Sequence, residues 1–248
     1  MNTMRRRVIH LAETDSTNRY LHDFILSPDD GMTVVAADYQ SAGRGQGTNH
    51  WESEAGKNLL FSVAVIPRNV PVARQFILSE AGALAVGDAL AAYTDDITLK
   101  WPNDVYWRDR KISGTLIETS VSSEGLRKCI FGIGINVNQQ TFHSDAPNPV
   151  SLAQIIGRET PLEELLEKTL RALEYYLDLI DRGESDAVSV LYHSRLYRRD
   201  GLFPYEDEKG VFRATIDHVE DDGHLILRDE QGCLRRYAFK EVQFIIEN

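Results

Sequence analysis

The chain has 248 residues, 42% of them hydrophobic, which is enough for one sizeable α/β domain and a small second unit. Acidic residues outnumber basic ones by 38 to 27, and the net charge of −11 argues against broad binding to nucleic-acid phosphates. Two cysteines are too few for a disulfide framework, and no apolar run approaches the ~18 residues of a membrane span. Since no signal peptide opens the chain, we expect a cytoplasmic protein.

The first half of the chain predicts alternating strands and helices. Hydrophobic periodicity and turn residues favour strands at 8–11, 33–38 and 58–67, a helix at 17–26 and an alanine-rich helix at 72–93. Asp15, Ser16 or Thr17 can cap the first helix with its side chain. The small residues of the long helix suit close packing against a sheet.

The second half predicts more strands, two helices and a β-rich tail. The expected elements are strands at 97–100, 104–107, 112–120 and 126–138, helices at 161–182 and 185–196, and tail strands at 211–219, 224–228, 234–239 and 242–246. Cys129 and Cys233 fall in strand-like stretches and are expected to be buried. The sequence therefore predicts an α/β (α+β) fold: a mixed β-sheet flanked by helices in a domain over residues 1–200, then a small β-barrel over 201–248.

A glycine-rich loop separates the second and third predicted strands. It reads D-Y-Q-S-A-G-R-G-Q-G-T-N-H-W from Asp38 to Trp51. Gly43, Gly45 and Gly47 leave successive backbone N–H groups free to converge on phosphate or carboxylate oxygens, and Arg44 adds a permanent positive charge. The loop is therefore a candidate anion-binding site.

Three further segments carry polar residues at the ends of predicted strands or helices. They are T-D-S-T-N at 14–18, L-K-W-P-N-D-V-Y-W-R-D-R-K-I-S-G-T-L-I-E at 99–118 and F-G-I-G-I-N-V-N at 131–138. Pro102 fixes its own φ and disfavours helix at Trp101, so K-W-P-N-D is expected to be a rigid turn. The lysines and asparagines of these segments suit the binding of a nucleotide.

The order and spacing of the four segments resemble the catalytic domain of biotin protein ligases, in the short form without an N-terminal DNA-binding domain. The resemblance implies a class II synthetase-like catalytic domain and an SH3-like C-terminal barrel. It also implies a two-step reaction, in which biotin and MgATP give biotinyl-5′-AMP and pyrophosphate. The biotinyl group then passes to one lysine of a biotin carboxyl carrier domain of acetyl-CoA carboxylase or a related carboxylase.

Activation of a carboxylate by ATP brings two anions together, so the reaction needs fixed positive charge at the point of contact. Arg44 and Lys111 are the candidates, and the resemblance places Lys111 against the biotin carboxylate and the α-phosphate. Asp104 is a hypothesis for a group that orients or deprotonates the acceptor lysine. A surface lysine in a hairpin is the ordinary structural alternative for Lys111.

The ureido ring of biotin needs uncharged donors and acceptors, which Ser16, Thr17 and Asn18 offer. Capping a helix is their alternative role, but three polar residues exceed what a cap requires. The resemblance adds further biotin contacts, namely Gln40, Gly43, Arg44, Gly45, Gln46, Lys111 and Gly114. The nucleotide contacts it implies are Trp51, Lys100, Asn103 and Asn136, with Mg²⁺ held on the phosphates.

The glycine loop departs from the family pattern G-R-G-R-x-G-R-x-W. Gln46 stands in place of the second arginine, Thr48 in place of a glycine and Asn49 in place of a third basic residue. The loop is less cationic, and we expect it to hold the adenylate less tightly.

Other functions are weighed against this one. A lipoate or octanoate ligase of the same fold would carry R-R-x-x-G-G-G-x-V-x-H-D, which is absent. A non-catalytic biotin-binding module would not need Lys100, Asn103 or Asn136. A repressor would need a helix-turn-helix, yet only residues 1–7 precede the first strand, so binding to DNA is not expected. The sequence leaves the oligomeric state open, a homodimer included.

Overall fold

The computed structural model describes residues 4–27, 31–47, 49–143 and 148–246. The strands of the larger part are β1 (Arg6–Thr14), β2 (Met32–Gln40), β3 (Leu59–Val65), β4 (Ile97–Lys100), β5 (Asp104–Trp107), β6 (Arg110–Ser122) and β7 (Gly125–Ile135). The helices are α1 (Thr17–His22), the short 3₁₀ helix η1 (Val72–Arg74), α2 (Phe76–Ala91), α3 (Leu152–Ile156), α4 (Leu162–Asp181) and α5 (Ser185–Ser194). The C-terminal strands are β8 (Phe203–Asp207), β9 (Gly210–Val219), β10 (Leu225–Asp229), β11 (Leu234–Tyr237) and β12 (Gln243–Phe244).

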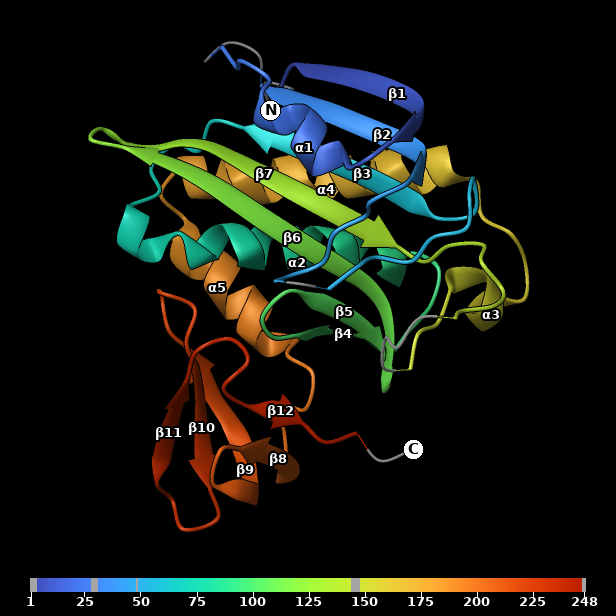
Figure 1. Ribbon diagram of the computed structural model, residues 1–248. Coiled ribbons are helices and arrows are strands. Elements are labelled where there is room, and N and C mark those ends of the chain that lie inside the picture. The colour runs from blue at the N-terminus through green and yellow to red at the C-terminus, as the bar shows by residue number, and fades with distance from the viewer. Residues whose placement is uncertain (1–3, 28–30, 48, 144–147, 247–248) are drawn as a thin grey trace.

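A seven-stranded mixed sheet with the order β1-β2-β3-β7-β6-β5-β4 forms the centre of the molecule (Figure 1). β1 pairs with β2 in parallel, and the other neighbouring pairs of this sheet are antiparallel. Helices α2 and α4 cover one face, and α1 lies on the opposite face against β2, β3 and β7. This arrangement confirms the predicted mixed sheet flanked by helices.

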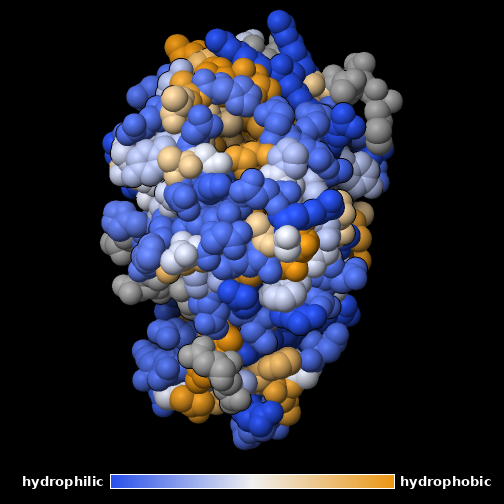
Figure 2. Space-filling model, turned by 90° about the vertical axis from the view of Figure 1, so that its right-hand side faces the viewer, coloured by the Kyte–Doolittle hydropathy of each residue, from blue (hydrophilic) through white to orange (hydrophobic). Residues whose placement is uncertain are grey.

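Helix α2 is apolar on nearly every side because it is enclosed, with α4 against one side and β4, β5 and β6 against another. Small residues bring it close to the sheet, as predicted. A Cβ on Gly82 would lie 3.2 Å from the Phe131 ring of β7. Among the described residues, no helix has the length and apolar character needed to cross a membrane. The molecular face seen in Figure 2 is largely hydrophilic, with apolar side chains in separate groups.

The C-terminal strands form a five-stranded antiparallel sheet with the order β11-β10-β9-β8-β12. It begins at Phe203, close to the expected boundary at residue 201. β11 and β12 are the two end strands of this order, so closure into an SH3-like barrel stays a prediction. Several hydrogen bonds join this sheet to the larger part. Among them, His193 Nε2 accepts from the Val219 backbone N–H at 2.9 Å, and Trp101 Nε1 donates to the Gly223 carbonyl at 2.9 Å.

Helix α1 is shorter than predicted, ending at His22 instead of residue 26. The ammonium of Lys128 on β7 donates to the carbonyl oxygens of Leu21, His22 and Phe24, so a distant strand satisfies the groups that a longer helix would have paired. Ser16 is the N-cap residue by backbone geometry, but its side chain makes no capping bond. The predicted side-chain cap is therefore wrong at Ser16.

Two elements were not predicted. Helix α3 carries a local signal, since Ser151 and Gln154 form a reciprocal capping box and Gly157 ends the helix with φ of 73°. Strand β8 contains Pro204, which has no N–H to donate to a neighbouring strand, so the sequence does not favour a strand here. Its carbonyl oxygen nevertheless accepts from Ile245, and Tyr205 is fully buried.

Both cysteines are free, and their environments differ. Cys129 on β7 is fully buried as predicted, and burial raises the pKa of its thiol. Cys233 is exposed in the turn before β11, so its predicted burial is wrong. Cys233 directly precedes β11, so it belongs to the turn and its side chain is not covered by the sheet.

Glu80 on α2 is a carboxyl group buried beneath α5. Only 3% of its surface is exposed, and one oxygen accepts from the Ser189 hydroxyl at 3.3 Å. The other oxygen has no hydrogen-bond partner among the described residues. Burial raises the pKa of this carboxyl to about 7, because the charged form is poorly solvated.

We predict that Glu80→Gln stabilises the protein at pH 8 and much less at pH 5. Between pH 4.5 and about 7 the folded protein keeps a proton that the unfolded chain has lost, so the free energy of unfolding of the native chain falls as pH rises through this window. The amide removes that loss, which amounts to about 3 kcal/mol for a shift of this size. Urea unfolding at both pH values measures the effect, with exposed Glu124→Gln as the control; equal gains at pH 5 and pH 8 would contradict it.

Candidate active site

A cavity of about 960 Å³ opens between the central sheet, the glycine loop and the C-terminal segment 239–244. It holds every predicted site residue apart from Gly43. Those lining it are Ser16, Thr17, Asn18, Gln40, Arg44, Gly45, Gln46, Trp51, Lys100, Asn103, Asp104, Lys111, Gly114 and Asn136. Its volume lies at the upper end of the range for ligand pockets, which run to about 1,000 Å³. Four segments separated in the sequence therefore share one space.

The glycine loop folds back on itself as a small hairpin. The Gly45 N–H donates to the Asn49 carbonyl at 2.7 Å, and the Trp51 N–H donates to the Gly43 carbonyl at 3.1 Å. The expectation that the Gly45 N–H points to an anion is therefore wrong in this conformation, because closing the hairpin uses that donor. Gly43 is buried beside Trp51 and lies outside the cavity lining. Thr48 lies outside the described residues.

Two glycines of β7 make the floor of the cavity. A Cβ on Gly132 would lie 2.1 Å from Asn18 Oδ1, and a Cβ on Gly134 would lie 2.5 Å from Trp51 Cε2. Contacts this short force a neighbour to shift, so a methyl group at either position must displace the side chain of Asn18 or Trp51. Because residues 132, 134 and 136 of an extended segment face the same side, Asn18, Trp51 and Asn136 follow one another over about 13 Å.

The polar turn 16–18 is held by side chains of the sheet. Gln40 Oε1 accepts from the Thr17 backbone N–H at 2.7 Å and from the Thr17 hydroxyl at 3.1 Å. From β3, the Ser62 hydroxyl lies 2.7 Å from Thr17 Oγ1 and 2.6 Å from Asn18 Oδ1. Ser16 is buried, and its hydroxyl makes no capping bond to α1. The turn therefore presents a fixed, uncharged polar surface.

Lys111 on β6 and Asp104 at the start of β5 form an ion pair at the other end of the cavity. Lys111 Nζ lies 2.7 Å from Asp104 Oδ1, with 22% and 17% of the two side chains exposed. The Lys111 backbone is fixed as well, because its N–H donates to Asn148 and its carbonyl accepts from Val150, both at 2.9 Å. The backbone of Lys111 is thus fixed, and Asp104 holds its ammonium beside Trp51 of the glycine loop.

Lys100 ends β4 in a mostly buried position. Its ammonium lies 5.3 Å from the Tyr106 ring centre and 4.6 Å from that of Phe244 in β12. Burial lowers the pKa of this amine, an effect that the nearby Asp104 opposes. Asn103 donates from Nδ2 to the Thr115 carbonyl at 2.6 Å, which leaves its side-chain oxygen for a ligand.

Two buried polar side-chain atoms of the glycine-loop segment 38–51 lack hydrogen-bond partners among the described residues. They are Gln46 Oε1 and Trp51 Nε1. A buried acceptor or donor left unpaired costs on the order of 1–3 kcal/mol, so native proteins seldom keep one without a use. A ligand with polar groups of its own would satisfy both atoms.

Sequence reasoning missed several parts of this site. Ser62 could have been found from the sequence, because it is the one polar residue in the buried strand L-L-F-S-V-A-V. The glycines of β7 carry a signal as well, since they alternate on one face of a strand. The contribution of the C-terminal sheet carries no local signal; its residues in the cavity are Phe239, Lys240, Val242, Gln243 and Phe244.

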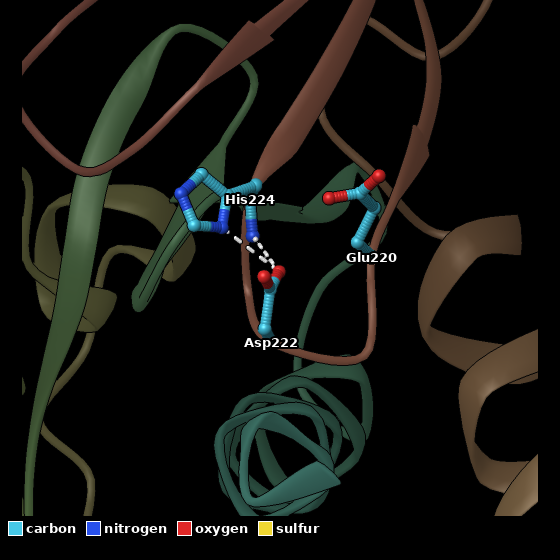
Figure 3. Close-up of side chains that lie close together, drawn as sticks. All are labelled: Glu220, Asp222 and His224. Atoms are coloured by element: carbon cyan, nitrogen blue, oxygen red, sulfur yellow. Dashed lines mark hydrogen bonds and ion pairs between the residues drawn. The ribbon is translucent and has the colours of Figure 1, made fainter. Parts of the chain in front are cut away.

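Glu220, Asp222 and His224 come together at the turn between β9 and β10 (Figure 3) and have the donor types of a cation site. Arg236 Nε lies 2.6 Å from Glu220 Oε2, and Arg236 Nη2 lies 2.6 Å from Asp222 Oδ2. The same guanidinium lies 3.0 Å from His224 Nδ1. Arg236 already supplies the positive charge here, so these residues form an ion-pair network.

The family was identified by comparison with known proteins. The model of the biotin/lipoate A/B protein ligase family matches residues 11–136, slightly more than half of the chain. The chain belongs to this family. The matched range contains every predicted site residue, including Asn136 at its end.

Individual relatives extend the likeness to nearly the whole chain. The biotin–[acetyl-CoA-carboxylase] ligase of Paracoccus denitrificans is 29% identical over 90% of this chain and 94% of its own. The bifunctional ligase/repressor BirA of Bacillus spizizenii is 28% identical over 95% of this chain and 73% of its own. The biotin protein ligase of Aquifex aeolicus in complex with biotin and ATP superposes with a TM-score of 0.78 at 27% identity, covering 96% of this chain and 99% of that one.

We predict that Gly134→Ala displaces the Trp51 indole from the cavity floor at little cost to the fold. The new methyl group would overlap the Trp51 indole. Because Trp51 stands at the end of a loop, the indole can move away without disturbing the sheet. The expected loss of stability is below the ~1–3 kcal/mol of typical overpacking. Acrylamide quenching of Trp51 fluorescence, taken as the difference from a Trp51→Phe background, should rise.

Gly132→Ala is the matched comparison. Its methyl group meets Asn18, which Ser62 and Glu118 hold in place, so the full overpacking cost of about 1–3 kcal/mol is expected. Unchanged quenching of Trp51 in Gly134→Ala would show that the indole does not depend on this glycine.

Proposed function

We propose that this protein is an ATP-dependent biotin protein ligase that makes biotinyl-5′-AMP and transfers biotin to a lysine of a biotin carboxyl carrier domain. The observation that carries the proposal is the single cavity in which an uncharged polar turn and fixed cations lie at opposite ends of one floor. The family match and the similarity to ligases of known activity support it.

Biotin is proposed to lie along β7 with its ring at the polar turn. The ureido group has both donors and acceptors, and the turn offers the Ser16 hydroxyl, which does not cap α1, together with the network of Thr17, Asn18 and Gln40. The apolar chain of biotin would lie along the glycine floor, and the Trp51 indole, which covers Gly134 in this conformation, would move aside to admit it. Its carboxylate would then reach Lys111, because the floor leads from Asn18 toward the Lys111 end of the cavity.

ATP is proposed to bind at the end of the cavity that holds Lys100, Asn103 and Asn136. Attack of the biotin carboxylate on the α-phosphorus forms the acyl phosphate bond and releases pyrophosphate. Lys111 and Arg44 would stabilise the negative charge on both reactants, and a rigid backbone at Lys111 avoids reorganisation during the reaction. Trp51 is proposed to pack beside the adenine.

The second step transfers the biotinyl group to a lysine of the carrier domain. The attacking amine must lose a proton, and Asp104 is the proposed group that orients the amine or accepts this proton. In the present arrangement Asp104 faces Lys111, so it would become available when Lys111 turns to the bound anions. AMP leaves as the amide bond forms.

Mg²⁺ is proposed to enter with the triphosphate. Of the described residues that line the cavity, Glu52 and Asp104 carry carboxylates, and both already contact neighbouring groups. Phosphate oxygens and water would therefore provide most of the ligands, as Mg²⁺ prefers, with the side-chain oxygens of Asn103 and Asn136 as neutral protein ligands. The ion would neutralise part of the phosphate charge.

The alternatives are less well supported. A lipoyl or octanoyl chain has no ureido group and would leave the polar turn unsatisfied. A non-catalytic biotin-binding module would not explain the burial of Lys100, which lowers the pKa of its amine. Burying a charged amine costs free energy, and a bound anion offsets that cost. Pyrophosphate exchange with biotin, lipoate and octanoate compared side by side separates these functions.

We predict that Lys111→Ala reduces formation of biotinyl-5′-AMP by about 10²–10³-fold, the usual effect of removing one charge-stabilising donor. The protein is incubated with biotin, MgATP and a carrier domain, and the products are read by mass. Exposed Lys168→Ala on α4 is the matched control and should retain full activity. Normal adenylation by Lys111→Ala would exclude the proposed role.

We predict that Asp104→Asn slows single-turnover transfer from preformed biotinyl-5′-AMP by about 10²-fold or more, as expected for loss of a general base. Starting from the adenylate isolates the second step from any effect on Lys111. Asp96→Asn, which alters a surface ion pair with Arg108, is the control. Transfer at the native rate in Asp104→Asn would remove this residue from the second step.

A further inference from the structure

Lys240 is a lysine of the C-terminal sheet that reaches the cavity of the catalytic part. It follows β11 in the connection to β12 and lines the cavity together with Phe239 and Phe244. The connection and β12 lie against the end of β4, because the Phe239 ring is 6.4 Å from that of Trp101, which follows β4, and the centre of the Phe244 ring in β12 is 4.6 Å from Lys100 Nζ. The lysine is therefore carried by a segment packed against the proposed nucleotide end.

The Lys240 ammonium touches the glycine loop. A Cβ built on Gly47 would lie 2.7 Å from Lys240 Nζ, and Gly47 itself has φ of 68°. Glycine at position 47 thus leaves room for the ammonium as well as allowing the turn. Lys240 adopts φ of 72°, a conformation that costs free energy for a residue with a side chain. Two residues with positive φ, of which Lys240 carries the conformational cost, place this charge at the meeting point of the loop and the C-terminal sheet.

The Lys240 ammonium differs from that of Lys111 in its charge partners. Lys111 is paired with Asp104, whereas Lys240 has no carboxylate partner among the described residues. The loop beside it is poor in positive charge, because Gln46 and Asn49 stand where basic residues occur in the family pattern. Lys240 places a cation next to these neutral side chains.

We propose that Lys240 binds the phosphate groups of the nucleotide, so that the C-terminal sheet supplies a positive charge that the glycine loop lacks. The inference rests on the proposed function, which makes ATP the ligand at this end of the cavity. An ammonium on a flexible stem suits phosphate oxygens, which accept charge-assisted hydrogen bonds from several directions. The C-terminal sheet then forms part of the ATP site and acts as a positioning element for the first step.

The test is Lys240→Gly, which removes the ammonium and suits the positive φ, so the fold should be kept or stabilised. We expect the KM for ATP in biotinyl-5′-AMP formation to rise roughly 10-fold or more, the usual effect of losing a hydrogen bond to a charged group. The Kd for biotin should not change. Lys209→Gly, in the β8–β9 turn of the same sheet and outside the cavity, is the control and should leave the KM for ATP unchanged.

A second variant tests the relation to the loop. Gln46→Arg introduced into Lys240→Gly should restore the affinity for ATP, since the new guanidinium stands in the neighbouring loop. A raised KM that Gln46→Arg does not lower would overturn the proposed compensation, and an unchanged KM in Lys240→Gly would overturn the inference as a whole. If the native protein forms no biotinyl-5′-AMP at all, the proposed function fails instead, so the two failures are distinguished.

Discussion

The absence of side chains at positions 132 and 134 is the constraint on which the cavity depends. Gly132 admits the amide of Asn18 and Gly134 admits the ring of Trp51, each at a distance that a Cβ would not allow. β7 lies near the middle of the sheet, paired with β3 and β6, so its backbone has no freedom to move away. The polar turn, the glycine loop and the cations of β4 and β6 are all positioned around this floor.

The cavity is also a local exception to the charge of the molecule. In a chain with a net charge of −11, it gathers Arg44, Lys100 and Lys111 around two carboxylates. The sheet and the C-terminal segment exclude water from part of this space, which strengthens the attraction of a cation for an incoming anion. Burial has a cost, visible in the lowered pKa of Lys100, and a bound anion offsets it.

The elements that the sequence predicted well have a complete local pattern. Helices α4 and α5 and strands β4 and β5 agree within about one or two residues, the usual uncertainty of helix and strand ends. The exceptions have particular causes. Lys128 on β7 binds the carbonyl oxygens at the end of α1, and Pro204 weakens the strand pattern of β8. The segment S-L-A-Q-I-I-G contains the capping box of α3, but the helix that follows it is short.

The sequence by itself determined the chemistry available, because residue types and their order specify an anion-binding loop, an uncharged polar turn and two lysines suited to phosphates. Only the tertiary structure decided which of them share a cavity. It placed Ser62 within hydrogen-bond distance of the polar turn and paired Asp104 with Lys111. It also brought the segment 239–244 against Lys100. These contacts join residues far apart in the chain, and they follow from strand order and packing, which no local pattern encodes.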